Sequence, residues 1–216
     1  TAQLRVVSLQ AYGQGVYGLC NRRALVEADG SMEWVLGEFG GLLSRSSFAS
    51  ELRGEGASSK ALLLFAGSGR QHLDFPGAMT HVGRHTESEM TVRGVLSGKA
   101  RSIFRGSSHI LRGAKESKAY QKESTLLLSP AARADAIPGL IIDENAVQAG
   151  HAATAGKVDD AMLFYLESRG IEPNEARRLI VHGYFEPVLQ RVPIEALRTE
   201  IERLIDEKLS AEPQAG

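Results

Sequence analysis

The stretch AVQAGHAATAGKVDDAMLFYLESRGI, residues Ala146–Ile171, separates two parts of the chain that carry different sequence patterns. Before it, short apolar runs are broken by glycine and polar residues, which is typical of strands joined by turns. After it, apolar residues recur at helical spacing and prolines stand at helix starts. A single histidine, His151, lies at the junction among small residues. We therefore expect the fold to divide here and the function to involve this junction.

The N-terminal part, residues 1–155, is predicted to be mainly β. Its expected strands are short apolar runs bounded by Gly, Ser, Asn or Asp, namely Leu4–Leu9, Ala24–Glu27, Ala61–Phe65, Ser102–Phe104, Ser124–Leu128 and Leu140–Ile142. Arg93-Gly94 is echoed by Arg112-Gly113, 19 positions further on, and repeats of ~20 residues are typical of solenoids. From the pattern alone, a β-solenoid and a β-sandwich both remain open.

The C-terminal part, residues 156–216, is predicted to form a helical subdomain. Asp159 and Asp160 open a first helix that ends near Arg169, before Gly170. Prolines at 173 and 193 open two further helices, the second of the three extending to about Gln190. The apolar positions expected to face the core are Ala176, Leu179, Ile180, Phe185, Ile194, Leu197, Ile201, Leu204 and Ile205. Residues 210–216 are expected to be disordered.

The charge balance argues against one class of function. The chain has 25 Lys and Arg residues against 26 Asp and Glu residues, and its net charge is -1. Proteins that bind nucleic acid through phosphate contacts normally show a basic bias. No apolar run approaches the ~20 residues that span a bilayer, and the N-terminus lacks the pattern of a signal peptide. We expect no binding to nucleic acid or membrane, and the missing initiator Met indicates a fragment of a longer protein.

The single cysteine, Cys20, excludes an internal disulfide framework and a Cys-rich metal or iron–sulfur site within this chain. This usage fits a reducing, cytoplasmic setting. Because Cys20 lies in the apolar run VYGLC, we expect a buried small hydrophobic side chain rather than a nucleophile. The two adjacent basic pairs, Arg22-Arg23 and Arg177-Arg178, are expected to be solvated surface.

Several enzyme signatures are absent from the sequence. Gly94–Lys99 reads GVLSGK, which has neither the spacing nor the Ser or Thr of a phosphate-binding loop. No dinucleotide-binding G-x-G-x-x-G motif follows a strand, and Gly67-Ser68-Gly69 lacks the frame of a hydrolase nucleophile elbow. The sequence therefore favours a protein that is not an enzyme.

The histidines outside the junction give weak signals. His81 and His85 would face the same side of a strand, so the geometry admits a metal pair, but no third ligand stands nearby in sequence. Surface or turn positions are favoured for both. Nothing in the sequence brings His72 with Asp74, or His109, together with catalytic partners. These residues carry no functional prediction.

His151 differs in its surroundings. It is flanked by Ala149, Gly150, Ala152 and Ala153, whose side chains offer little shielding. An imidazole on such a platform is accessible to a ligand or a partner, can bind a metal and can titrate near neutral pH. Taken alone, the pattern still favours a histidine tolerated at a domain boundary.

The segment from Ser124 to Ile171 resembles the core of the SufB/SufD family of iron–sulfur cluster assembly proteins. The residues that match the family pattern are Leu126-Leu127-Leu128-Ser129, Ala132, Pro138, Leu140-Ile141-Ile142, Asn145-Ala146-Val147, His151, Ala153-Thr154, Gly156, Leu163-Phe164-Tyr165-Leu166 and Ser168-Arg169-Gly170-Ile171. Upstream matches are His72, Asp74, His81, Ser88 and the run Ile103–Gly106. The resemblance covers most of the chain and is dense from Leu126 to Phe185.

This resemblance implies a right-handed parallel β-helix core over residues 1–155, followed by C-terminal helices. It implies a soluble heterodimer with SufB, bound to the ATPase SufC through those helices. His151 would lie at the interface with SufB, where the cluster is thought to form, and would ligate metal only together with that partner. The isolated chain would hold no cofactor, and a transient iron–sulfur cluster would be shared in the complex.

Two types exist within the family, and the chain resembles the SufD type. SufB-type sequences carry a cysteine before the proline and a glutamate directly after the histidine. Here Ala132 and Asp135 stand in the first region, and Ala152 follows His151. SufD-type sequences often carry a cysteine two residues before the histidine, where this chain has Ala149. The N-terminal helical region of the family is missing as well.

The predicted function is a non-catalytic scaffold. The residues expected to contact the ATPase are Phe164, Tyr165, Ser168, Arg169, Gly170 and Phe185. Among the aromatic residues here, Phe164 is favoured as core, and Tyr165, Tyr184 and Phe185 can be core or interface anchors. Two alternatives remain open. One is a β-solenoid carbohydrate-active enzyme, which would need paired carboxylates on one face, and the other is a homodimeric structural module.

Overall fold

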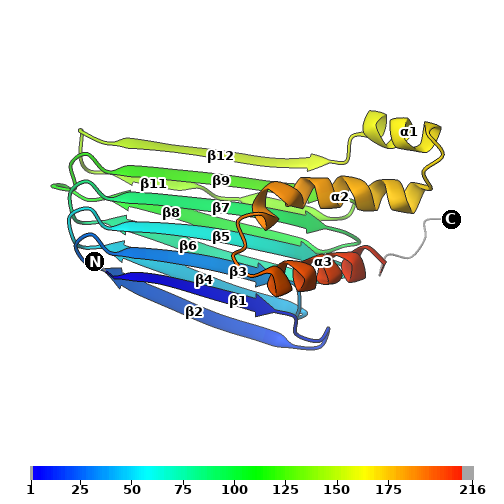
Figure 1. Cartoon of the computed structure of the whole chain (residues 1–216), viewed down its shortest axis with the longest axis horizontal. Helices are drawn as coiled ribbons and strands as arrows, with labels where there is room; N and C mark the ends of the chain where they lie inside the picture. The colour runs from blue at the N-terminus through cyan, green and yellow to red at the C-terminus, as the bar shows by residue number, and fades with distance from the viewer. Residues whose placement is uncertain (1, 211–216) are drawn as a thin grey trace.

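Two sheets face each other in the N-terminal part of the computed structural model, and the chain winds from one sheet to the other (Figure 1). The structure describes residues 2–210. Sheet A contains, in spatial order, β1 (Gln3–Gln10), β3 (Ser31–Glu38), β5 (Ser58–Gly67), β7 (Glu87–Leu96), β9 (Lys118–Leu127) and β12 (Gln148–Lys157). Sheet B contains β2 (Tyr17–Val26), β4 (Leu43–Leu52), β6 (His72–His81), β8 (Arg101–Ile110) and, end to end along β8, β10 (Arg133–Ala136) and β11 (Gly139–Ile142).

All strand pairs of the described residues are parallel, so the predicted parallel β-solenoid is confirmed and the β-sandwich alternative is wrong. The structural repeat is longer than the sequence echo suggested. The register partners Glu87, Lys118 and Gln148 in sheet A are 31 and 30 residues apart. Arg93 lies in β7, whereas Arg112 lies in the turn after β8, so their 19-residue spacing is not the repeat.

Stacked side chains fill the space between the two sheets. At the middle of the solenoid they are large and apolar, and Leu63, Phe65, Leu73, Phe75 and Met79 are all fully buried. The rings of Phe65 and Phe75 pack with their centroids 5.0 Å apart. Burying a side chain of this size contributes roughly 1.5–3 kcal/mol, so these stacked rows supply much of the stability of the fold.

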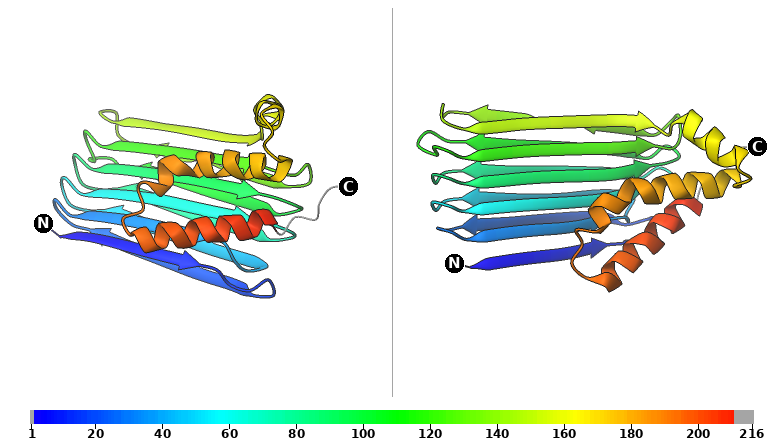
Figure 2. Two further views of the ribbon diagram at one scale, coloured as in Figure 1. Left: turned by 45° about the vertical axis from the view of Figure 1, so that its right-hand side comes forward. Right: turned by 45° about the horizontal axis from the view of Figure 1, so that its top comes forward.

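Two helices cover the outer face of sheet A, while the outer face of sheet B carries no helix within residues 2–210 (Figure 2). These are α2 (Pro173–Leu189) and α3 (Glu195–Ser210). Their buried residues Val181, Phe185 and Ile201 join a cluster with outward-facing residues of sheet A such as Leu62 and Val95. A further helix, α1 (Asp160–Ser168), buries none of its residues.

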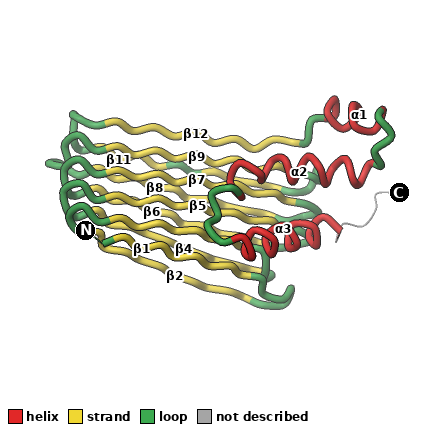
Figure 3. Tube along the Cα trace, viewed as in Figure 1, coloured by secondary structure: helices red, strands yellow, loops and turns green. Residues whose placement is uncertain are grey.

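Strands and helices occupy separate parts of the chain, as Figure 3 shows. β12 extends to Lys157, just past the boundary expected after Ala155. Asp159 caps α1 by accepting a hydrogen bond from the backbone N–H of Ala161 at 2.9 Å. Gly170 follows α1 with a φ of 84°, a left-handed conformation that favours glycine. The order of the three helices therefore agrees with the sequence pattern.

The details of the helices differ from the pattern at several residues. The extent of α2 is as predicted, to about Gln190, because its buried face packs on sheet A although Gly183 and Pro187 weaken the helix. α3 begins at Glu195 rather than Pro193. Leu179 and Ile194, both expected in the core, are 45% and 48% exposed. The expectation of disorder for residues 210–216 lies, from residue 211 on, outside the described residues.

His81 is a buried member of a polar chain rather than a surface histidine, so that expectation is wrong. Its side chain is fully buried at the end of β6. Its Nδ1 lies 2.8 Å from Thr86 Oγ1, and its Nε2 lies 2.8 Å from Ser88 Oγ. Burial lowers the pKa of His81 to about 4, so the imidazole is neutral at physiological pH and serves the structure.

Replacing Gly94 by Ala is expected to destabilise the chain. A Cβ at Gly94 would lie 2.0 Å from Cζ of Phe65, whose ring packs over this glycine in the neighbouring strand. Overpacking of this kind costs about 1–3 kcal/mol or more. Gly183→Ala is the matched control, because a Cβ there meets no atom within 4 Å and Ala favours a helix by roughly 1 kcal/mol. Urea unfolding measures both, and equal effects would contradict the packing argument.

Candidate functional site

The C-terminal end of the solenoid is open, because the last strand of sheet A has no strand of sheet B opposite it. Sheet A ends in β12, whereas sheet B ends in β10 and β11, which follow β9 in the chain (Figures 1 and 2). Among the described strands, β12 pairs with β9 alone, so its other edge offers unpaired backbone groups. We call the inner faces of β9 and β12, together with this edge, the open end.

His151 lies at the open end and points toward the inside of the solenoid. It is the register partner of Gln121, whose side chain donates a hydrogen bond into sheet B. A Cβ at Gly150 would lie 3.8 Å from the ring of Tyr120, which places that position on the outer face. Because successive strand residues alternate between faces, His151 faces inward. It is nevertheless exposed, since no strand of sheet B covers it.

The interior of the solenoid becomes polar toward the open end. Two stacked rows of register partners illustrate the change: Leu36, Leu63, Val92, Glu123 and Ala153 form one, and Phe65, Gly94, Thr125 and Ala155 form the other. Gln121, Glu123 and Thr125 on the inner face of β9 are only 5%, 5% and 2% exposed. Three buried polar side chains therefore stand where the preceding turn has Met90, Val92 and Gly94.

Several polar atoms of these side chains lack partners. Nε2 of Gln121 donates to Ser108 Oγ at 2.9 Å and to the Gly139 carbonyl at 3.1 Å, and this pairing fixes the amide orientation. Gln121 Oε1, Glu123 Oε2 and Thr125 Oγ1 are buried and make no hydrogen bond within residues 2–210. Such groups are rare in native proteins and indicate a water, ligand or partner at that place.

Glu123 is the buried acid of the open end. Burial raises the pKa of its carboxyl group to about 7, and the nearby Thr125 hydroxyl opposes this shift without reaching hydrogen-bond geometry. A carboxyl group with such a pKa changes its charge near physiological pH. The open end thus combines an accessible imidazole, a buried acid and a buried amide oxygen on two neighbouring strands.

The sequence identified His151 but missed Gln121 and Glu123. Both lie in the strand expected around Ser124–Leu128, which the structure extends back to Lys118. Their alternate spacing was a signal, because polar residues at every second position occupy one face of a strand. Only the strand register shows that this face is the inner one.

The predicted partner contacts divide between the surface and the core. Those that are exposed are Phe164, Tyr165, Ser168, Arg169 and Gly170. Phe164 is 72% exposed, so the core position favoured for it is wrong. The guanidinium of Arg169 lies 5.1 Å from the centroid of the Tyr165 ring. Phe185 is fully buried between α2 and sheet A, so its prediction as a partner contact is corrected to a core residue.

The remaining histidines form no metal site. No group of three or more His, Cys, Asp or Glu side chains in residues 2–210 is arranged to hold a metal ion. His85 lies in an exposed turn with a φ of 55°. Nε2 of His109 lies 2.8 Å from Oδ2 of Asp143 on the surface. Asp74 is held between Arg45 and Arg105 on the outer face of sheet B.

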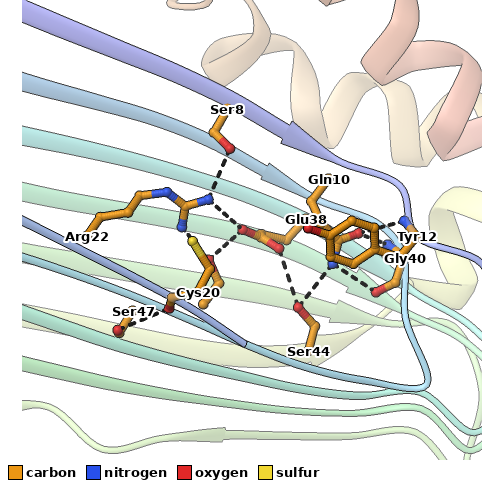
Figure 4. Close-up of polar contacts among 10 residues, drawn as sticks. Ser8, Gln10, Tyr12, Cys20, Arg22, Glu38, Gly40, Ser44 and Ser47 are labelled. Atoms are coloured by element: carbon orange, nitrogen blue, oxygen red, sulfur yellow. Dashed lines mark hydrogen bonds and ion pairs between the residues drawn. The ribbon is translucent and has the colours of Figure 1, made fainter. Parts of the chain in front are cut away.

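The N-terminal end of the solenoid carries a second polar cluster (Figure 4). Arg22 donates to Ser46 Oγ at 2.7 Å and to Ser8 Oγ at 3.0 Å, and it lies 3.7 Å from the Glu38 carboxylate. Arg22 is therefore a half-buried network residue, which corrects the expectation of solvated surface. Burial raises the pKa of Glu38, and Ser46 and Arg22 oppose that shift.

Cys20 lies beside this cluster and is exposed, which corrects the expectation of a buried thiol. The expectation failed because β2 is the first strand of sheet B and has a neighbouring strand on one side only. In that position the apolar run VYGLC gains less cover than the same residues would have in a central strand. The thiol therefore lies at the end of the solenoid opposite to His151.

A shallow groove of about 480 Å³ runs along the outer face of sheet A beside the open end. Side chains along it include Glu89, Tyr120 and Lys122. Arg191, just after α2, pairs with Glu89 at 3.1 Å and marks where the helical cover ends. The helices thus leave the outer faces of β9 and β12 accessible at this level.

Replacing Glu123 by Gln is expected to change the pH dependence of stability. Because the folded-state pKa is raised above the unfolded value of about 4.5, the contribution of this carboxyl group is favourable below pH 4.5 and is lost as pH rises through about 7. The stability of the variant relative to wild type should therefore increase by about 2 kcal/mol from pH 5 to pH 8. Urea unfolding at both pH values measures this, with the exposed Glu167→Gln as control. A pH-independent difference would contradict the account.

The comparison with protein families gives one match over most of the chain. A model of the family described as "SUF system FeS cluster assembly, SufBD core domain" matches residues 1–184. This range contains the whole solenoid, α1 and much of α2. No helix of residues 2–210 is long and apolar enough to cross a membrane.

Curated relatives agree with the family match. The chain is 37% identical over 90% of its length to the iron–sulfur cluster assembly protein SufD of Bacillus subtilis, covering 45% of that protein. It is 35% identical over 95% of its length to a SufBD family protein of Mycobacterium leprae, covering 24% of that protein, and 34% identical over 94% to one of Staphylococcus saprophyticus, covering 44%. The chain thus spans less than half the length of these relatives. With its parallel solenoid and its open end, the chain belongs to the SufBD family of iron–sulfur cluster assembly proteins and is SufD-like.

Proposed function

We propose that this chain is part of a scaffold subunit that presents His151 at a cluster-forming interface. The observation that supports this most directly is the open end, where an accessible imidazole stands on an unpaired edge strand above a polar interior. Iron–sulfur clusters are held mainly by cysteine thiolates. The only thiol of this chain lies at the opposite end of the solenoid, so a partner must supply the thiolates.

The proposed partner at the open end is SufB. An edge strand with free backbone groups can be continued by a strand of another chain, which gives both affinity and a defined register. The small side chains of β12, including Ala152 and Ala153, leave room for a second solenoid to approach His151. The cluster is cargo that the two subunits would share, and this chain would contribute a ligand and a shape.

The proposed partner at the helices is the ATPase SufC, with α1 as the docking surface. α1 buries no residue of its own and exposes Phe164 and Tyr165. Exposed aromatic side chains of this size are typical anchors of protein interfaces. Since α1 follows β12 after only a short connection, a movement of the ATPase would be passed directly to the strand that carries His151. Such a complex would act in the cytoplasm.

A homodimer is the second candidate, because the free edge of β12 can also pair with the same strand of another copy. Size-exclusion chromatography of the chain with and without SufB separates the two. The carbohydrate-active alternative would need paired carboxylates on one face. Asp74, a buried carboxylate on the outer face of sheet B, is instead paired with two arginines, so it does not support this alternative.

Replacing His151 by Ala in the full-length protein is expected to slow cluster assembly in the reconstituted complex at least tenfold. Removal of one ligand or its support typically costs 10–100-fold in metal affinity or activity. Complex formation should be unchanged, because the backbone edge of β12 is retained. His109→Ala, at a half-buried histidine of sheet B that is paired with Asp143, is the matched control. Unchanged assembly in His151→Ala would refute the ligand role.

Replacing Phe164 and Tyr165 by Ser is expected to weaken SufC binding by about 30-fold or more. An aromatic anchor at an interface centre contributes about 2 kcal/mol or more, so the loss of even one of the two corresponds to about 30-fold. Binding is measured by surface plasmon resonance with the full-length protein. The control is Ile194→Ser, which removes an apolar side chain that is 48% exposed in the connection between α2 and α3. Retained binding in the double variant would place the ATPase interface elsewhere.

A further inference from the structure

Glu123 is a buried carboxyl group without a counter-charge. The residue is 5% exposed, and its Oε2 makes no hydrogen bond within residues 2–210. No Lys, Arg or His side chain of the same residues forms an ion pair with it. Because burying an unpaired charge is costly, buried charges in native proteins are normally paired. The missing counter-charge therefore points to a group outside the described residues.

The opposite end of the solenoid shows how this fold compensates such an acid. Glu38 in β3 lies one strand in from the first strand of sheet A, as Glu123 in β9 lies one strand in from the last. Arg22 of β2, the terminal strand of sheet B, lies 3.7 Å from the Glu38 carboxylate (Figure 4). At the open end, the terminal strand of sheet B carries apolar residues on its inner face, namely Ala134, Ala136, Leu140 and Ile142. Sheet B thus supplies a cation to one acid and none to the other.

A long side chain can reach Glu123 from the open end. The register partner of Glu123 on β12 is Ala153, which is exposed and has only a methyl group. A strand that continued sheet A past β12 would place its inner residue about 4.8 Å beyond Ala153, so its Cα would lie about 9.6 Å from that of Glu123. Lys and Arg carry their charge on long apolar stems, which can pass over the Ala153 methyl group.

Cation and carboxylate pairs between neighbouring strands already occur in this sheet. Arg5 and Glu33 are register partners and lie 2.5 Å apart, and Lys118 and Glu87 are register partners that lie 3.0 Å apart. Both pairs are on the outer face. The strand spacing of sheet A therefore suits such pairs, and the inner face at Glu123 lacks only the cation.

We propose that the open end takes up a lysine or arginine side chain of the subunit that pairs with β12, with Glu123 as its counter-charge. The inference rests on the proposed function, from which it takes this partner, and it adds the chemistry by which the partner is recognised. A buried charge without a partner is unfavourable, so a subunit with an acidic residue at this place is disfavoured. Glu123 therefore contributes to the choice of partner as well as to its affinity.

Supplying the cation within the chain tests whether the interior at Glu123 accepts one. In the full-length protein, Ala153→Arg places a guanidinium beside Glu123 in register. We expect the urea midpoint at pH 8 to rise in Ala153→Arg, and not to rise when Glu123→Gln is present as well. The matched control is Ala152→Arg, an exposed neighbour on the outer face of β12, whose effect should not depend on Glu123. Equal shifts of Ala153→Arg with and without Glu123 would overturn the inference.

Binding of SufB to the full-length protein, measured by surface plasmon resonance, tests the origin of the cation. We expect Glu123→Gln to weaken binding at least tenfold, because it leaves the partner's charge buried and unpaired. The matched control is Glu38→Gln, which removes a buried acid that is paired within the chain and should change the affinity less than twofold. Replacing each Lys and Arg of SufB by Met should identify one residue whose loss weakens binding of wild type but not further that of Glu123→Gln. Circular dichroism verifies that each variant is folded.

The outcomes separate this inference from the proposed function. Equal SufB affinity of wild type and Glu123→Gln would overturn the inference and leave the proposed function intact. Weaker binding without a coupled Lys or Arg in SufB would assign the place to water or a neutral donor, and would overturn the inference as well. Failure of wild type to bind SufB would instead refute the proposed partner, and the source of the cation with it.

Discussion

Parallel stacking of strands about 30 residues apart in sequence is the interaction on which the rest of this structure depends. In sheet A, Glu87 pairs with Lys118 and Lys118 with Gln148, so each turn of chain is held by the next one. A solenoid does not close on itself as a barrel does, so the last strand of its stack keeps an edge with unpaired backbone groups. At the C-terminal end that strand is β12, and it carries His151. The place where stacking stops is therefore the place where a partner can continue it.

The same constraint explains the gradient in the interior. Residues at one register position lie above one another, so Leu63 in a central turn is buried between the apolar register partners Leu36 and Val92. Nearer the ends, buried acids appear on the inner face, Glu38 in β3 and Glu123 in β9, each one strand in from an end of sheet A. The two ends differ in an important way. Glu38 is paired with Arg22 and two serines, whereas Glu123 has no partner in the described chain. The unpaired acid at the open end fits a group brought by another molecule.

The three helices differ in how they pack against the solenoid. α2 and α3 bury apolar residues on sheet A and fix the outer face, while α1 stays outside this contact and exposes its aromatic residues. The sequence pattern located α1 and α2 through Asp159, Gly170 and Pro173, and α3 within two residues through Pro193, because capping residues and proline act locally. It did not assign the roles of Phe164 and Phe185 correctly, since it favoured the core for Phe164 and left Phe185 as core or interface. Only packing shows that one is exposed and the other is core.

The sequence by itself predicted the mainly β class, a division near residue 155, the family and, through the resemblance, His151 as a candidate ligand. These depend on local patterns and on motifs of consecutive residues. The tertiary structure alone decided the 31- and 30-residue spacings, the exposure of Cys20 and Phe164, and the buried position of His81. It also placed Gln121 and Glu123 beside His151, since strand register joins residues about 30 positions apart. The physical reason is that a solenoid makes its contacts between turns, and the inward face of a strand is set by those contacts rather than by its own residues.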